Sequence, residues 1–297
     1  MPKGKRTLII SSSDMDFQVC YHRKGQLNMT IKTFFLNNER TAYVRAFILN
    51  RIEQTPWTHA RPAVVIFPGG GYEFCSEKEA EPLAMRYVAE GFNAFILNYT
   101  CGKKYPAAFT NAAYAMFKIK ARADEFGIDR EKIAVVGASA GGHLAGCLAT
   151  MWSDTGIVRV IGCEPDDIRP AAAVLCYPVI SGVTSPHKSS FAILAGDDAN
   201  QAALSRLSLE NRVTPKTPPI FLWCTADDAT VSAHNSIVMA KACVSNGVPV
   251  EMHMYDSGPH GLSDCSKSAG ADGRFYDLPC AGWVGLSVKF LKKYLNL

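Results

Sequence analysis

The chain has 297 residues, of which 48% are hydrophobic and 20% are charged, and its mean hydropathy is +0.01. This is the composition of an ordinary globular protein, and it excludes disordered, collagen-like and coiled-coil chains. The 31 Lys and Arg residues against 27 Asp and Glu give a net charge of +4, spread along the chain without a basic block. So small an excess argues against binding to nucleic acid or to an anionic membrane.

The first residues of the chain and the spacing of its cysteines indicate in which cellular compartment the protein is expected. The first apolar run, Leu8 to Ile10, is too short for the core of a signal peptide, and no stretch reaches the roughly 18 apolar residues that span a bilayer. We therefore expect a cytoplasmic protein. The ten cysteines contain no C-x-x-C pair, so we expect reduced structural thiols rather than disulfides, and neither a metal nor a cofactor.

Apolar runs separated by polar turns predict the secondary structure in chain order. Two short strands are expected first, at 29–35 and 42–49. Continuous apolar runs then predict buried strands at 63–67, 94–97, 133–136, 172–176, 219–223 and 248–255. Amphipathic spacing predicts helices at 109–126, 142–151, 231–245 and 283–294. This alternation indicates an α/β fold with a mostly parallel central sheet and helices on both faces.

The chain contains no repeat and no low-complexity linker, so we expect a single domain over 1–297. Residues 1–40 would form an N-terminal extension and the first strand. The segment 178–215 is less regular than the rest. It predicts either a small lid or specificity insertion, or an ordinary helix with a long loop.

The strongest motif is Gly-Ala-Ser-Ala-Gly at 137–141, directly after the strand 133–136 and before a helix. This is G-x-S-x-G in the strand–turn–helix context in which the motif has meaning. A tight turn raises the Ser139 hydroxyl above the sheet, and small neighbours prevent collisions with the backbone. The helix that follows directs its N-terminal N–H groups at the reaction centre. We therefore predict that Ser139 is a nucleophile.

A serine hydroxyl needs a positioned base, and His260 has the best context among the seven histidines. It stands in a loop after the strand 248–255 and before the last helix. His143 lies one turn after Ser139 on the same helix, so we expect it to point into the packing. The orienting acid is expected after the strand 219–223, where Asp227 and Asp228 compete, and either aspartate could instead cap the next helix. The order Ser, Asp, His is that of α/β-hydrolases.

Glycines at 69–71 follow the strand 63–67, where the donors for a developing oxyanion are expected. Without side chains, their N–H groups can approach a substrate oxygen closely, and the N–H of Ala140 would complete the site. Position 74 is Phe and no Gly-Lys-Ser/Thr follows, so neither a dinucleotide fingerprint nor a P-loop is present.

These motifs, together with Thr-Pro-Pro-Ile-Phe-Leu-Trp-Cys-Thr-Ala-Asp-Asp at 217–228 and Pro-His-Gly-Leu at 259–262, resemble the α/β-hydrolases of the esterase and lipase group. Within that group, residues 40–297 are similar to the acetyl-esterase or xylan-esterase branch related to feruloyl esterases. The chain departs from the common patterns with Pro68 for a His and with Cys224 for another His. The resemblance implies an α/β-hydrolase fold and assigns roles to particular residues. These are a catalytic triad of Ser139, Asp227 and His260 and oxyanion donors at Gly70, Gly71 and Ala140. Asp228 is then the residue that we expect to cap the helix.

The resulting prediction is a serine carboxylester hydrolase that removes acetyl groups, with xylo-oligosaccharides as the expected carbohydrate. A serine peptidase or amidase with the same triad is the alternative, and a non-catalytic binding protein or a lipase is less favoured. Substrate could stack on aromatic side chains near strand ends, namely Tyr72, Tyr105, Tyr177 and Trp57, although such residues are as often core. The expected partner is a small-molecule or oligosaccharide ester, and a monomer or a homodimer fits equally well.

Overall fold

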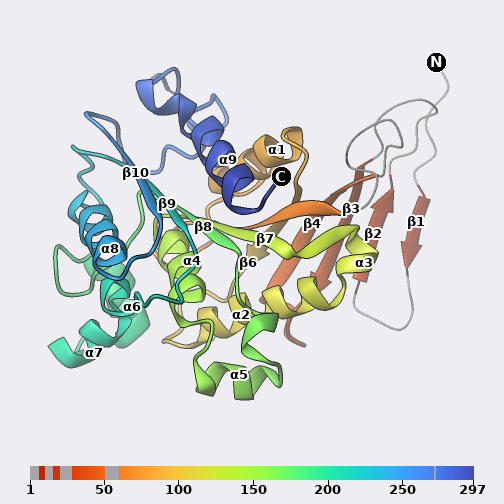
Figure 1. Ribbon diagram of the computed structural model, residues 1–297, viewed down its shortest axis with the longest axis horizontal. Helices are drawn as coiled ribbons and strands as arrows, with labels where there is room; N and C mark the ends of the chain where they lie inside the picture. Colours follow the sequence, from red (N-terminus) through yellow and green to blue (C-terminus); the bar gives the residue numbers. More distant parts are fainter. Residues whose placement is uncertain (1–6, 11–15, 21–28, 51–59, 271) are drawn as a thin grey trace.

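The computed structural model describes residues 7–10, 16–20, 29–50, 60–270 and 272–297 (Figure 1). Its centre is a ten-stranded sheet in the order β1-β2-β3-β4-β6-β5-β7-β8-β9-β10. The strands are β1 (Thr7–Ile10), β2 (Asp16–Cys20), β3 (Met29–Phe35), β4 (Tyr43–Leu49), β5 (Arg61–Phe67), β6 (Asn93–Asn98), β7 (Ile128–Ala138), β8 (Ala172–Cys176), β9 (Ile220–Thr225) and β10 (Val250–Tyr255).

The sheet has two parts with different strand directions. β1 to β4 pair antiparallel, and β4 also pairs antiparallel with β6. From β6 through β5, β7, β8 and β9 to β10, all neighbours are parallel. The carboxyl ends of the parallel strands therefore lie at one edge of the sheet, which is where open α/β sheets bind their ligands.

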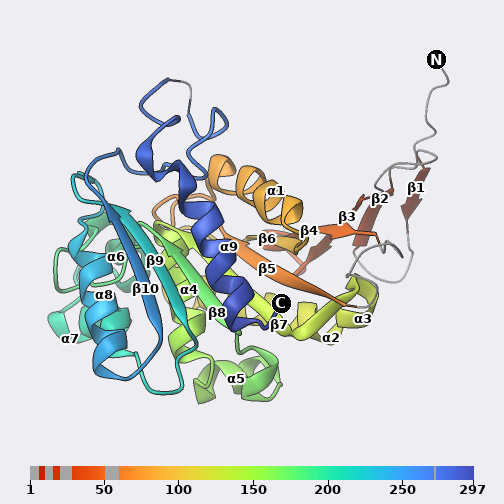
Figure 2. The same ribbon diagram turned by 45° about the horizontal axis from the view of Figure 1, so that its top comes forward.

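Helices cover both faces of the sheet, as Figures 1 and 2 show. One face packs against α1 and α9, and the other against helices that include α2, α4 and α8. The helices are α1 (Glu81–Ala89), α2 (Ala107–Ala121), α3 (Ala123–Phe126), α4 (Ala140–Met151), α5 (Thr155–Ile161), α6 (Lys188–Ala195), α7 (Gln201–Leu207), α8 (His234–Ser245) and α9 (Trp283–Tyr294). This arrangement confirms the predicted α/β fold with a mostly parallel sheet.

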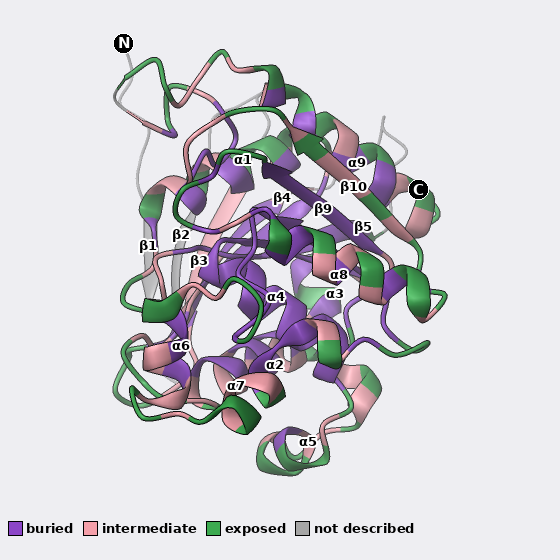
Figure 3. Cartoon of the chain, turned by 90° about the vertical axis from the view of Figure 1, so that its left-hand side faces the viewer, coloured by how far each residue is buried: buried purple, intermediate pink, exposed green. Residues whose placement is uncertain are grey.

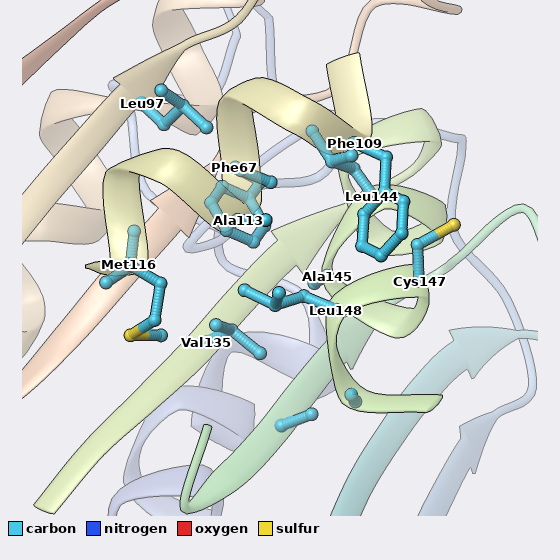
Figure 4. Packing of buried hydrophobic residues seen from close by; sticks show 14 of the residues in the cluster. Phe67, Leu97, Phe109, Ala113, Met116, Val135, Leu144, Ala145, Cys147 and Leu148 are labelled. Atoms are coloured by element: carbon cyan, nitrogen blue, oxygen red, sulfur yellow. The ribbon is translucent and has the colours of Figure 1, made fainter. Parts of the chain in front are cut away.

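The core beneath α2 and α4 fixes the first turn of α4 over the sheet. All seven residues of β5 and all twelve of α4 are buried. In Figure 3, β5 and β9 are buried along their length, whereas β10, the outer strand, is partly exposed. Figure 4 shows side chains of α2 and α4 packing against each other and against one face of the sheet, among them Phe67, Phe109, Ala113, Met116, Val135, Leu144, Ala145 and Leu148.

The predicted strands agree with the observed ones within two residues at each end, except that β7 begins five residues before the predicted 133–136, in the mostly polar stretch 128–132. β1, β2, α1 and α5 lie outside the predicted elements. The segment 178–215 contains α6 and α7, which contact each other. Whether this segment acts as a lid stays a prediction, as does the single domain.

The cysteines whose side chains are described all have free thiols. Two pairs lie close together, with Sγ atoms 3.8 Å apart for Cys75 and Cys101 and 3.3 Å apart for Cys265 and Cys280. None of the helices in the described part of the chain combines the length and apolar character needed to cross a bilayer. The cytoplasmic location and the oligomeric state stay predictions.

Candidate active site

Ser139 occupies the turn between β7, which ends at Ala138, and α4, which begins at Ala140. Its φ of 55° and ψ of −121° are strained for a residue with a side chain. Neighbouring strand ends hold this conformation, because the Ser139 N–H donates to the Cys176 carbonyl at 2.9 Å and the Ser139 carbonyl accepts from the Val179 N–H at 3.1 Å. A Cβ at Gly141 would collide with the carbonyl oxygens of Phe67 and Pro68, which explains the glycine after the serine.

A short hydrogen-bond chain leads from this turn across the sheet edge. The Ser139 hydroxyl lies 2.7 Å from Nε2 of His260, and Nδ1 of His260 lies 2.6 Å from Oδ2 of Asp228. Ser139 is 6% exposed, and only 1% of the Asp228 side chain is accessible. The imidazole can therefore accept the serine proton at one nitrogen while a buried carboxylate holds the other.

The acid on His260 is Asp228, so the assignment of that role to Asp227 is wrong. Asp227 is exposed, and its Oδ1 accepts from the Gly258 N–H at 2.8 Å. The expected capping role of Asp228 was also incomplete. Its Oδ1 accepts from the N–H groups of Thr230 and Val231, at 2.8 and 2.9 Å, while its other oxygen meets His260. One carboxylate thus closes the turn and orients the imidazole.

The glycine loop after β5 lies beside Ser139. Gly70 and Gly71 have φ of 114° and 66°, a backbone region that glycine adopts without strain. The Gly70 carbonyl accepts from the N–H groups of Glu73 and Phe74, which folds the loop into a tight turn. Gly70, Gly71, Ser139 and His260 together line a cavity of about 320 Å³. Ala140 is the first residue of α4, where backbone N–H groups have no partner within the helix.

The structure does not support the predicted substrate-stacking tyrosines. Tyr72 and Tyr177 are each 2% exposed and belong to the two cores, so neither ring can meet a substrate face. Tyr105 is half-buried, stacks on Phe109 at 6.0 Å, and is not part of the cavity lining. Trp57 lies outside the described residues. The rings of Tyr72 and Tyr177 are therefore packing residues.

His143 points into the packing, as expected. Its Nδ1 lies 2.8 Å from the Tyr72 hydroxyl and its Nε2 lies 2.9 Å from the Leu207 carbonyl. Burial lowers the pKa of His143 to about 4, although the Leu207 carbonyl acts in the opposite direction. The ring is therefore neutral near pH 7, with its Nε2–H donating to Leu207 and Nδ1 accepting from Tyr72.

Two residues of the site carry no signal in the sequence. His187, just before α6, lines the cavity, and its pKa is lowered by burial and by the neighbouring His260. Glu79 lies in a 3-10 helix (Glu77–Glu79) and is buried against the same cavity. Neither residue stands in a recognisable motif, since both reach the site only through the folding of their loops.

The comparisons with known proteins agree with this geometry. A family model described as alpha/beta hydrolase fold matches residues 64–263, and the chain belongs to that family. The chain is 33% identical over 210 residues to endo-1,4-beta-xylanase B of Butyrivibrio fibrisolvens, a match that covers 68% of this chain and 33% of the relative. It is 27% identical over 209 residues to the acetylxylan esterase of Xylanibacter ruminicola, covering 67% of this chain and 41% of that protein. The chain thus spans well under half the length of these relatives.

Solved structures match over more of their length. An acetyl ester-xyloside bifunctional hydrolase from Caldicellulosiruptor lactoaceticus superposes with a TM-score of 0.74 at 31% identity, covering 87% of this chain and 94% of that one. A carboxylesterase from Lactobacillus plantarum superposes with a TM-score of 0.73 at 26% identity, covering 90% of this chain and 97% of that one. These matches confirm the predicted resemblance to the acetyl-esterase and xylan-esterase branch of the family.

Proposed function

We propose that this protein is a serine carboxylester hydrolase. The observation that carries the proposal is the continuous chain from the Ser139 hydroxyl through His260 to the buried carboxylate of Asp228, at a cavity bordered by the glycine loop. Each part meets a requirement of acyl transfer: a nucleophile on a strained turn, a base in contact with it, and an acid that orients the base.

The reaction proceeds in two steps. Nε2 of His260 takes the proton of Ser139 as the hydroxyl oxygen attacks the ester carbonyl, and the N–H groups of Gly70, Gly71 and Ala140 stabilise the oxyanion. Each such donor contributes about 3 kcal/mol to transition-state stabilisation. His260 then protonates the leaving alkoxide, and water attacks the acyl-enzyme by the same route. Asp228 keeps the proton on Nδ1 of His260 and stabilises the imidazolium.

We further propose that the acyl group is acetyl and that the alcohol is a carbohydrate such as a xylo-oligosaccharide. The similarity to an acetylxylan esterase and to an acetyl ester-xyloside bifunctional hydrolase supports this choice. A cleft of about 870 Å³ adjoins the cavity and shares Lys78 with it. The cleft brings together the aromatic, amide and charged side chains of Tyr43, Asn98 and Arg86, a mixture that suits sugar hydroxyls and ring faces.

Removal of the nucleophile tests the reaction. Ser139→Ala should fold normally and lose turnover of para-nitrophenyl acetate by at least about 10⁴-fold, because no other hydroxyl in the described ranges forms a hydrogen bond with His260. Acetate release from acetylated xylo-oligosaccharides should fall equally, and wild type should hydrolyse aminoacyl amides and long-chain esters far more slowly than acetates. Retained hydrolysis by the variant would refute the mechanism, and faster amide cleavage would make the protein an amidase.

The adjoining cleft has its own test. Arg86→Ala should raise KM for acetylated xylo-oligosaccharides several-fold and leave para-nitrophenyl acetate unaffected, because the small ester does not extend beyond the cavity. Arg159→Ala, an exposed arginine on α5, is the matched control and should change neither substrate. Equal KM values for Arg86→Ala and wild type on the oligosaccharide would place the sugar elsewhere.

A further inference from the structure

Glu79 is a carboxylate that the fold buries at the candidate active site. It is 3% exposed, lies in the 3-10 helix after the glycine loop, and borders the cavity that holds Ser139 and His260. Within the described ranges no Lys, Arg or His side chain forms an ion pair with it. Burying a carboxylate without a cation is costly unless its oxygens accept hydrogen bonds, so the partners of Glu79 define what it is for.

One oxygen of Glu79 holds the glycine loop. Its Oε2 accepts from the Gly69 N–H at 3.0 Å, and the Gly69 carbonyl accepts from the Ser76 N–H at 3.0 Å. Both backbone groups of Gly69 are therefore fixed by the segment that carries Glu79. Gly69 immediately precedes Gly70 and Gly71, so a shift of Glu79 would move both proposed oxyanion donors.

The other oxygen of Glu79 reaches the histidine loop. Its Oε1 accepts from the Tyr177 hydroxyl at 2.8 Å, and the same hydroxyl oxygen accepts from the Ser263 N–H at 2.8 Å. The Tyr177 ring packs edge-on against the His260 ring, with centroids 5.1 Å apart and an angle of 73°. A second contact ties the same segments, because the Ser263 hydroxyl donates to the Lys78 carbonyl at 2.6 Å.

We propose that Glu79 is a positioning residue for acyl transfer, whose two carboxylate oxygens set the glycine loop and the His260 loop at a fixed distance from each other. The inference rests on the proposed function of Ser139 and His260. Transition-state stabilisation depends on donors held where the oxyanion develops, while the base stays aligned with the nucleophile. Glu79 connects these two requirements through Gly69 on one side and Tyr177 on the other.

Glutamine cannot take over this role, although it has the same shape. The Gly69 N–H and the Tyr177 O–H both donate, so the site needs two acceptors, and an amide offers one acceptor and one donor group. If the amide nitrogen faced Tyr177, the hydroxyl could accept from it but would leave its own proton unpaired. If the nitrogen faced Gly69, two donors would meet. Glu79→Gln is therefore a charge-free and shape-conserving probe.

The experiment compares Glu79→Gln and Tyr177→Phe with wild type on para-nitrophenyl acetate. We expect kcat to fall about 10- to 100-fold in each variant with KM within about threefold. The glycine loop and the His260 loop would be less firmly positioned, which affects the transition state more than the bound ester. Affinity for phenylboronic acid should fall in parallel with kcat/KM. In its adduct, boron forms a bond to the Ser139 oxygen, the serine proton moves to His260, and a tetrahedral anion occupies the oxyanion site. The double variant should lose little more than either single variant, since both interrupt one connection.

The control variant is Glu131→Gln, an exposed glutamate near the start of β7, which should leave kcat and boronate affinity unchanged. A purely structural role of Glu79 would lower the melting temperature without changing boronate affinity of the folded protein, and that result would overturn the proposal. Wild-type kcat in both Glu79→Gln and Tyr177→Phe would also overturn it. If Glu79→Gln does not fold, Tyr177→Phe decides alone. Retained activity in Ser139→Ala, measured in the same series, would instead refute the proposed function.

Discussion

Two histidine centres lie near the first turn of α4 and differ in the chemistry that they support. The first, the open centre, surrounds Ser139 at the start of the helix, where the hydroxyl meets His260 and His260 meets Asp228. The second, the sealed centre, lies one turn further along, where His143 meets the Tyr72 hydroxyl and the Leu207 carbonyl. Both centres join a hydroxyl to an imidazole, and the two hydrogen bonds have nearly equal lengths.

The two centres differ in the group that contacts the second nitrogen of the imidazole, the one that does not face the hydroxyl. In the open centre that partner is a carboxylate, which stabilises an imidazolium, and the site borders a cavity. In the sealed centre it is a neutral carbonyl, and the ring is 1% exposed. Burial therefore lowers the pKa of His143 to about 4, so its ring stays uncharged near neutral pH. A hydroxyl–imidazole contact is suited to acyl transfer when a carboxylate stabilises the imidazolium and a cavity admits the substrate.

Replacing each imidazole by a side chain that cannot act as a base should give the largest difference in kcat between the two centres. His260→Ala should lower kcat for para-nitrophenyl acetate by at least about 10⁴-fold with little change in melting temperature, because the base is lost from a partly accessible site. His143→Gln should keep kcat within about tenfold and lower the melting temperature, because a buried network is interrupted. A comparable loss of kcat in both variants would show that the sealed centre takes part in the reaction.

A second test asks which of the neighbouring residues Asp227 and Asp228 supports His260 in the open centre. Asp228→Asn should lower kcat by about 10³- to 10⁴-fold, because the amide can no longer hold the imidazole with Nδ1 protonated and the charge that stabilises the imidazolium is lost. Asp227→Asn should change kcat by less than about threefold, since an asparagine oxygen still accepts from the Gly258 N–H. Steady-state kinetics of the matched pair decide the assignment, and the reverse ranking would restore Asp227 as the acid.

The pH dependence of stability probes the sealed centre, with a smaller effect. His143 has a pKa of about 4 in the folded protein and an ordinary value of 6.5, so below pH 6.5 the unfolded chain binds the proton more readily. Stability should therefore be full above pH 6.5 and decline as pH falls toward 4. Between pH 7 and pH 5 this residue should cost about 2 kcal/mol of unfolding free energy, at about 1.36 kcal/mol for each pH unit below 6.5.

Urea unfolding of wild type and His143→Gln at the two pH values measures this contribution. The variant lacks the titrating group, so its loss of stability from pH 7 to pH 5 should be smaller by about that amount. Other groups titrate alike in both proteins and cancel in the difference. Identical losses in the two proteins would mean that His143 accepts a proton in the folded state as easily as in the unfolded chain.

The sequence predicts the parallel half of the sheet and most of the open centre for one physical reason. Buried strands are apolar runs, and the residues after their carboxyl ends gather at one edge, so Ser139, His260 and an aspartate after β9 could be expected together. The residues alone leave Asp227 and Asp228 open, and the family resemblance favours Asp227, whereas Asp228 contacts His260. A carboxylate has two oxygens, and Asp228 uses one to close the turn and the other to orient the imidazole.

The remaining site residues depend on how loops fold back. Tyr72 is a candidate for substrate stacking because it is an aromatic residue near a strand end, but its backbone has a φ of 67° and its ring is buried in the core. Glu79 and His187 approach Ser139 from separate loops, one after the glycine turn and the other before α6. A local sequence pattern cannot predict these positions, because they depend on the packing of segments that are distant along the chain.

At Ser139, the stability of the folded state and the proposed reaction favour different residues. A glycine would adopt the φ of 55° without strain, so the folded state alone would favour glycine at the position that chemistry reserves for serine. A change of Ser139 to glycine would relieve this strain and remove the hydroxyl that the proposed reaction needs. The fold thus tolerates backbone strain at Ser139 for a side chain that the proposed reaction uses.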